Sequence, residues 1–164
     1  MPDPHSTLSI FAEVSIALVG FSGIVIAFGR RSQGALTPLE VRRLSNLFAC
    51  AGGVLMMSII NLSLLHTSVD RGLFWSINSG VVLVLGSTWL LYDWVRIGRL
   101  DAGEREQVSR YILYPFNATA VLLLLLQGLN SAIWLQSWPY FLALGYAIAF
   151  ALQQFILLVR MGLR

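Results

Sequence analysis

Charge is scarce in this sequence. Of its 164 residues, 12% are charged and 57% are hydrophobic, whereas soluble domains have about 25% charged residues. Lysine is missing, so all 11 basic residues are arginines. This composition argues against a soluble globular domain and predicts a membrane protein with several spans.

Cysteine and histidine are rarer still. The single cysteine, Cys50, excludes a disulfide framework and clustered thiolate metal sites. The two histidines, His5 and His66, lie outside the apolar runs, which argues against a pair of haem ligands at membrane depth. No phosphate loop, zinc spacing, nucleophile elbow or dinucleotide fingerprint is present. We therefore expect no enzyme activity, catalytic residue, cofactor or metal, and no nucleic-acid partner.

Long apolar runs, in contrast, are abundant. A helix needs about 20 apolar residues to cross the hydrocarbon core of a bilayer, and five runs are that long. The sequence predicts an all-α polytopic membrane protein with one compact transmembrane domain over residues 1–164. The predicted helices cover residues 8–28, 38–65, 73–97, 102–135 and 139–161, and we expect a break or kink near Pro115 in the fourth.

The arginines are distributed asymmetrically between the loops. Residues 29–43 and 96–115 carry four each, and the C-terminus carries Arg160 and Arg164, whereas the other loops contain only Arg71. Because loops rich in arginine stay in the cytoplasm, we expect the N-terminus outside and the C-terminus inside. The pattern is typical of a bacterial cytoplasmic (inner) membrane protein.

The start of the second helix has a strong local signal. Thr37 is a favourable cap, Pro38 suits the first helical position, and Glu40 is placed to bond back to the cap. The sequence therefore predicts a capping box there, with the helix beginning before the membrane.

Glu13 is the only acidic residue within the first apolar run. A charged side chain at the bilayer centre costs about 2.5–3.5 kcal/mol on insertion scales, and such residues usually face a cavity or other helices. The arginines of the predicted helices lie near the helix ends, so no basic residue is expected at the depth of Glu13 to neutralise it. On a helix, Glu13 shares a face with the small residues Ala17, Gly20 and Ala27, as expected for a helix contact or a lined cavity.

Four amides are expected at a depth similar to that of Glu13. Asn61, Asn78 and Asn130 each lie four or five residues from the outer end of their predicted helix, and Gln127 lies one turn deeper. Together with Glu13 they form a candidate ion-binding layer, in which a carboxylate favours cations and amides replace hydration. The alternative is that the amides only link helices, at about 0.6 kcal/mol each.

Polar residues on several faces of the later helices favour self-association into a homo-oligomer in the lipid bilayer. The basic residues Arg30, Arg31, Arg42 and Arg43 suit docking of anionic lipid or of a membrane or cytoplasmic partner.

The leading functional hypothesis is a small cation-preferring ion channel or transporter subunit. The alternative is a non-transporting structural, accessory or sensor subunit of a membrane complex. A lipid-modifying or quinone-linked enzyme is a distant third.

Overall fold

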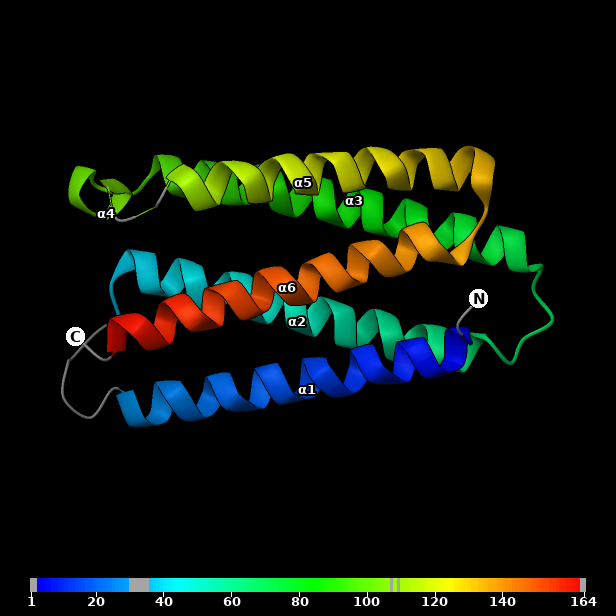
Figure 1. The fold of residues 1–164 in the computed structure, drawn as a ribbon, viewed down its shortest axis with the longest axis horizontal. Helices are drawn as coiled ribbons and strands as arrows, with labels where there is room; N and C mark the ends of the chain where they lie inside the picture. The colour runs from blue at the N-terminus through cyan, green and yellow to red at the C-terminus, as the bar shows by residue number, and fades with distance from the viewer. Residues whose placement is uncertain (1–2, 30–35, 107, 109, 163–164) are drawn as a thin grey trace. The chain divides into compact units, whose positions relative to one another are not determined.

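The computed structural model describes residues 3–29, 36–106, 108 and 110–162. The described residues form helices and short turns and contain no strand, which confirms the all-α prediction. In chain order the helices are α1 (Pro4–Gly29), α2 (Pro38–Leu64), α3 (Arg71–Gly98), α4 (Ala102–Glu106), α5 (Arg110–Leu129), the π-helix η1 (Asn130–Trp134) and α6 (Ser137–Gly162) (Figure 1).

Five helical segments are long and apolar enough to cross a membrane. They are Pro4–Ile24, Pro38–Leu64, Arg71–Gly98, Leu113–Trp134 and Ser137–Arg160. The predicted number of apolar helices is therefore confirmed, as expected for an integral membrane protein. The orientation of the chain and its self-association stay predictions.

The start of α1 lies earlier than the predicted residue 8. The Asp3 carboxylate accepts hydrogen bonds from the backbone N–H groups of His5 (3.3 Å) and Ser6 (3.2 Å). Pro4 occupies the first helical position, where its missing N–H costs nothing. Since Glu13 is nine residues after Pro4, it lies near the middle of the Pro4–Ile24 span instead of close to its end.

The start of α2 agrees with its local signal. Glu40 N–H donates to Thr37 Oγ1 (3.2 Å), and Thr37 N–H donates to Glu40 Oε2 (2.8 Å). Pro38 occupies the first turn. The predicted capping box is confirmed.

The segment around Pro115 differs from expectation. The short helix α4 ends at Glu106, α5 starts at Arg110, and Pro115 lies inside α5. The interruption therefore precedes the proline instead of coinciding with it. A proline near the start of a helix removes only one intrahelical hydrogen bond, and membrane helices tolerate that loss where neighbouring groups compensate.

The chain divides into two compact units. Unit 1 comprises residues 1–67 and 144–164, with α1, α2 and most of α6, and unit 2 comprises residues 68–143. α6 is one continuous helix whose first residues belong to unit 2. Each unit has its own packing.

Unit 1 is packed around small residues. α1 and α2 lie side by side and antiparallel (Figure 1). Leu18, Ala51 and Ala151, one from each helix, form a buried cluster, against which Val19, Cys50 and Ile148 pack. On α1 the buried residues Leu8, Ser15, Leu18 and Ser22 recur at intervals of three, four or seven residues, so one stripe of this helix makes the contact.

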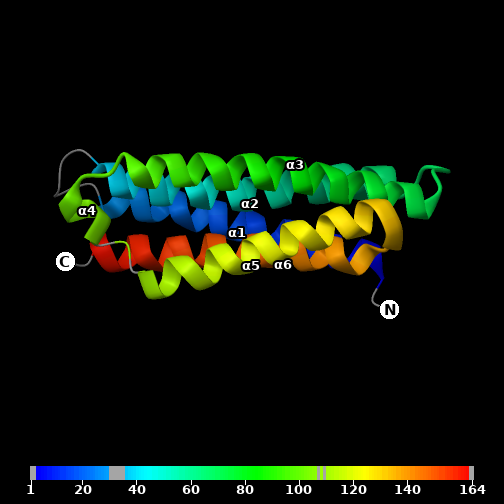
Figure 2. The same cartoon turned by 90° about the horizontal axis from the view of Figure 1, so that it is seen from above.

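Unit 2 contains α3, α5, η1 and the start of α6. A Cβ atom at Gly86 would lie 2.7 Å from Leu124 Cδ2, so this glycine permits the close approach of α3 and α5. α5 and α6 are joined through η1 (Figure 2). Trp75 of α3 packs against Tyr140 and Phe141 of α6, with ring centroids 5.7 and 5.4 Å apart.

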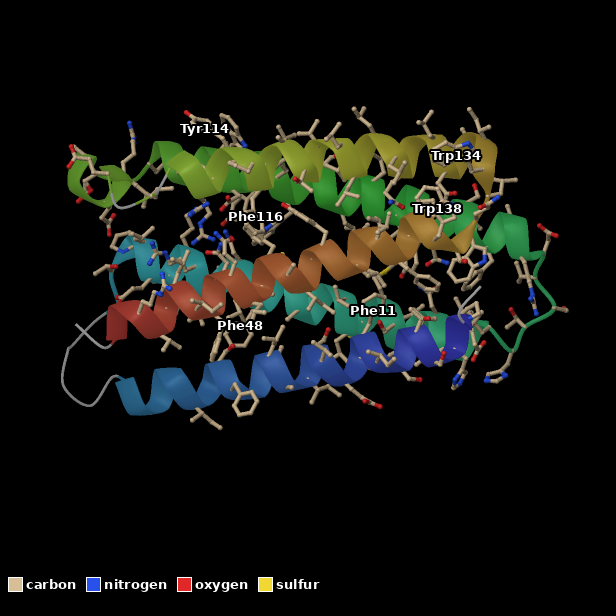
Figure 3. The ribbon with its side chains drawn as sticks, viewed as in Figure 1. Phe11, Phe48, Tyr114, Phe116, Trp134 and Trp138 are labelled. Carbon is tan, nitrogen blue, oxygen red and sulfur yellow. The ribbon has the colours of Figure 1, made fainter. Side chains whose placement is uncertain are left out.

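The tryptophans near the α5–α6 connection are half exposed. Trp134 and Trp138 are each 40% exposed and stack with their centroids 5.6 Å apart (Figure 3). Exposed indole rings at a helix end are typical of the membrane–water interface. Trp75 and Tyr140, in contrast, are buried and contribute to packing.

We expect the substitution Ala51→Leu to destabilise the protein by about 1–3 kcal/mol, because extra methylene groups overpack a filled contact. Thermal unfolding in detergent micelles, followed by circular dichroism, measures the effect. Ala149→Leu is the matched control, since Ala149 is exposed on α6. Equal losses of stability in the two variants would contradict close packing at Ala51.

Candidate functional site

Glu13 faces away from the other helices of unit 1. Its side chain is exposed, as are those of Ala17 and Ile24 on the same face of α1. A Cβ atom built at Gly20 meets nothing within 4 Å. Glu13 lies about 200° around the helix from the fully buried Ser15, because each residue advances the helix by 100°. The part of the predicted stripe formed by Ala17 and Gly20 therefore lies on the outer surface of α1.

Asn61 lies in the opposite kind of environment. Its side chain is fully buried near the end of α2, and its backbone carbonyl oxygen accepts a hydrogen bond from the N–H of Leu65 at 2.9 Å. Asn61 and Glu13 both belong to unit 1, but one side chain is enclosed and the other is exposed. A shared site for these two candidates stays a prediction.

Asn78 is buried on α3 and bonds within its own helix. Its Nδ2 donates to the carbonyl oxygen of Phe74 at 2.9 Å, one turn earlier. This local bond satisfies part of the amide within α3.

Asn130 closes the connection between α5 and α6. Its Nδ2 donates to Gln136 O (2.8 Å) and Ser79 Oγ (2.7 Å), and its Oδ1 accepts the N–H of Gln136 at 3.0 Å. The side-chain amide thus both donates to and accepts from the backbone of Gln136, as the backbone of a neighbouring β-strand would. The side chain is fully buried.

The backbone at this connection is irregular. η1 is a π-helix, in which Leu135 N–H donates to Asn130 O at 3.0 Å. Leu135 itself has φ = 56°, a left-handed conformation that disfavours residues other than glycine, asparagine and aspartate. The hydroxyl of Ser76 donates to Ser131 O, which connects η1 to α3. Bonds from Asn130 and Ser76 therefore stabilise an otherwise unfavourable turn.

Gln127, about one helical turn before Asn130, also bonds to the connection between α5 and α6. Its Nε2 donates to Pro139 O at 2.8 Å, and the residue is fully buried. Its Oε1 accepts no hydrogen bond from any described residue. Three of the five candidates, Asn78, Gln127 and Asn130, thus lie in unit 2 and donate to backbone carbonyls.

Several polar residues that are buried, or bonded to a buried amide, did not emerge from the sequence analysis. Ser15 and Ser58 are fully buried in unit 1, and their hydroxyls make no hydrogen bond with the described residues. Ser79 and Gln136 complete the hydrogen bonds of Asn130 in unit 2. Single serines in apolar helices have no distinctive spacing, so the sequence offered little signal for them.

The basic residues expected to dock a partner divide into two pairs. Arg42 and Arg43 are buried, with 4% and 7% of their surface exposed. Arg30 and Arg31 lie outside the described residues. A docking role for these arginines stays a prediction.

Within the described part of the chain, no group of three or more histidine, cysteine, aspartate or glutamate side chains is placed to hold a metal ion. Comparisons with protein-family models, with curated proteins and with solved structures find no match to this chain.

Replacement of Asn130 by alanine should lower the free energy of unfolding by about 1–2 kcal/mol, because three hydrogen bonds are lost at a buried turn. Asn117→Ala serves as the control, since the buried Nδ2 of Asn117 has no partner among the described residues. Thermal unfolding in micelles compares the two variants. A loss of stability no greater for Asn130→Ala than for Asn117→Ala would remove the closing role assigned to Asn130.

Proposed function

We propose that this protein is a small membrane subunit that assembles with copies of itself and passes a cation along the contact between copies, where Glu13 provides the cation-binding group. The observation that carries the proposal is the exposure of Glu13 in the middle of a span. The carboxylate is thus available to a second chain and not to the interior of its own unit.

The energetic argument concerns the surroundings of this carboxylate in a bilayer. Facing lipid, an ionised side chain costs about 2.5–3.5 kcal/mol on insertion scales. Contact with a second copy removes the lipid and allows water or a cation to reach the group. Ala17 and Gly20 on the same face leave room for such close approach between helices.

A carboxylate in a narrow hydrated contact attracts cations and repels anions. Carboxylates within membrane spans also take part in the proton relays of pumps and transporters. The proposal therefore includes protons and small metal cations as the transported species.

The proposed setting is a bacterial cytoplasmic membrane, with the N-terminus outside and the C-terminus inside. The support is the arginine distribution, in which Arg71 is the only arginine outside the loops and terminus assigned to the cytoplasm.

A second candidate is a non-transporting structural, accessory or sensor subunit of a membrane complex. The hydrogen bonds of Asn78, Gln127 and Asn130 favour it, because all three amides donate to backbone carbonyls. Residues committed to helix packing are not free to replace the hydration shell of a passing ion. In this alternative Glu13 contributes only to the contact with a neighbouring chain.

Purified protein in lipid vesicles should conduct a cation, and Glu13→Gln should reduce the flux at least about tenfold, because the negative charge is lost. Flux of H⁺, Na⁺ and K⁺ is measured with fluorescent indicators inside the vesicles. Glu13→Asp should retain flux, and Glu106→Gln, at an exposed acid in α4 outside the spans, should not reduce it. Vesicles tight to all three ions, or equal flux in wild type and Glu13→Gln, would favour the second candidate.

Disulfide cross-linking tests the contact between copies. In a Cys50→Ser background, Ala17→Cys should form an oxidised dimer in membranes, because the face of Ala17 is expected to meet its counterpart. Val84→Cys is the control, since Val84 is 64% exposed on α3. Dimer yields on non-reducing gels that are equal at the two positions would argue against association through this face of α1.

A further inference from the structure

The two histidines of the chain, 61 residues apart in sequence, meet at one end of unit 1. The ring centroids of His5 and His66 lie 6.2 Å apart, with an angle of 63° between the ring planes. His5 belongs to the first turn of α1, and His66 lies in the turn after α2. Both side chains are exposed.

The backbone on both sides of this pair is held by hydrogen bonds. Asp3 accepts the N–H of His5 and that of Ser6. Beside His66, Thr67 donates its N–H (3.0 Å) and its hydroxyl (2.7 Å) to Leu64 O. These hydrogen bonds hold the backbone that carries each ring, at the start of α1 for His5 and in the turn after α2 for His66.

The helix ends beneath the rings are packed. Leu8 lies one turn after His5, and Asn61 lies just over one turn before His66. Both side chains are fully buried, with 0% of their surface accessible to solvent. The two imidazoles are therefore presented at the water-accessible edge of a packed helix pair.

The distance between the rings suits a shared metal ion. A ligand bond of about 2.0 Å to a ring nitrogen places the metal about 3 Å from each ring centroid, so two coordinating rings have centroids about 5–6.5 Å apart. The observed 6.2 Å lies within that range.

We propose that His5 and His66 form a binding site for a divalent transition metal ion. Cu²⁺ is bound most tightly, and Ni²⁺ and Zn²⁺ are bound more weakly. Imidazole nitrogen suits these ions, and their order of affinity is general for nitrogen donors. Mg²⁺ and Ca²⁺ are disfavoured because they prefer oxygen ligands. No third histidine, cysteine or carboxylate completes the site among the described residues, so water fills the remaining positions.

Binding of the metal links the start of α1 to the end of α2. This bond would add a direct link between two points of unit 1 that lie 61 residues apart in sequence. It is independent of the proposed transport activity, since neither Glu13 nor its face of α1 takes part.

The experiment uses full-length protein in detergent micelles, purified with an affinity tag that contains no histidine, because the chain has only two. Cu²⁺ is added in steps and followed by electron paramagnetic resonance. We expect one Cu²⁺ per chain with two nitrogen ligands in its hyperfine pattern. His5→Gln and His66→Gln should each weaken binding at least about tenfold, since each removes one of two protein ligands. The double variant, which lacks both imidazole ligands, should bind at least as weakly as the weaker single variant.

Ile10→Ala is the control, since Ile10 is 58% exposed on α1 one turn beyond His5. It should bind Cu²⁺ as wild type does. Circular dichroism checks that all variants keep their helix content. The number of nitrogen ligands bound to Cu²⁺ is measured on the wild type, so this result does not depend on the folding of any variant. A wild-type spectrum with fewer than two nitrogen ligands, or unchanged affinity in His66→Gln, would overturn the proposal.

Discussion

A hydrocarbon interior offers no hydrogen-bond partner to the backbone, and the rest of this structure depends on that constraint. Helices satisfy it along their length, so the difficult places are their ends and the turns between them. At the ends of this chain's helices, side chains supply the missing partners. Asp3 and Thr37 cap α1 and α2, and Asn130 pairs with the backbone of Gln136 after η1.

This constraint separates two kinds of polar residue that look alike in the sequence. Asn78, Gln127 and Asn130 lie in apolar helices because the backbone, their own or a neighbour's, accepts their amide protons. Glu13 has no such arrangement and faces outward in the middle of its span. The fold of one chain accounts for the three amides, whereas it does not account for the carboxylate.

Much of the fold could be predicted from the sequence, because span length is a direct consequence of bilayer thickness. The start of α1 was missed although its signal was present, since Asp3 and Pro4 form a favourable cap and first position. The outward direction of Glu13 was not readable, because both the lipid-facing and the packed sides of a membrane helix are apolar.

The turn at η1 was beyond local prediction for another reason. Leu135 adopts a left-handed conformation although it is not a glycine, so residue preferences do not predict this conformation. The pairing of Asn130 with Ser79 depends on the register between α3 and α5, which apolar repeats do not specify. Of the candidate residues, the sequence thus identified the polar positions but not their partners.

The closing bonds of the α5–α6 connection join residues that are close in sequence. Asn130 and Gln136 are six residues apart, and Gln127 and Pro139 are twelve apart. Contacts of such short range form early, because little chain entropy is lost in making them. The connection can therefore begin to close as soon as the first turn of α6 has been synthesised, and the bonds to Ser76 and Ser79 of α3 complete it.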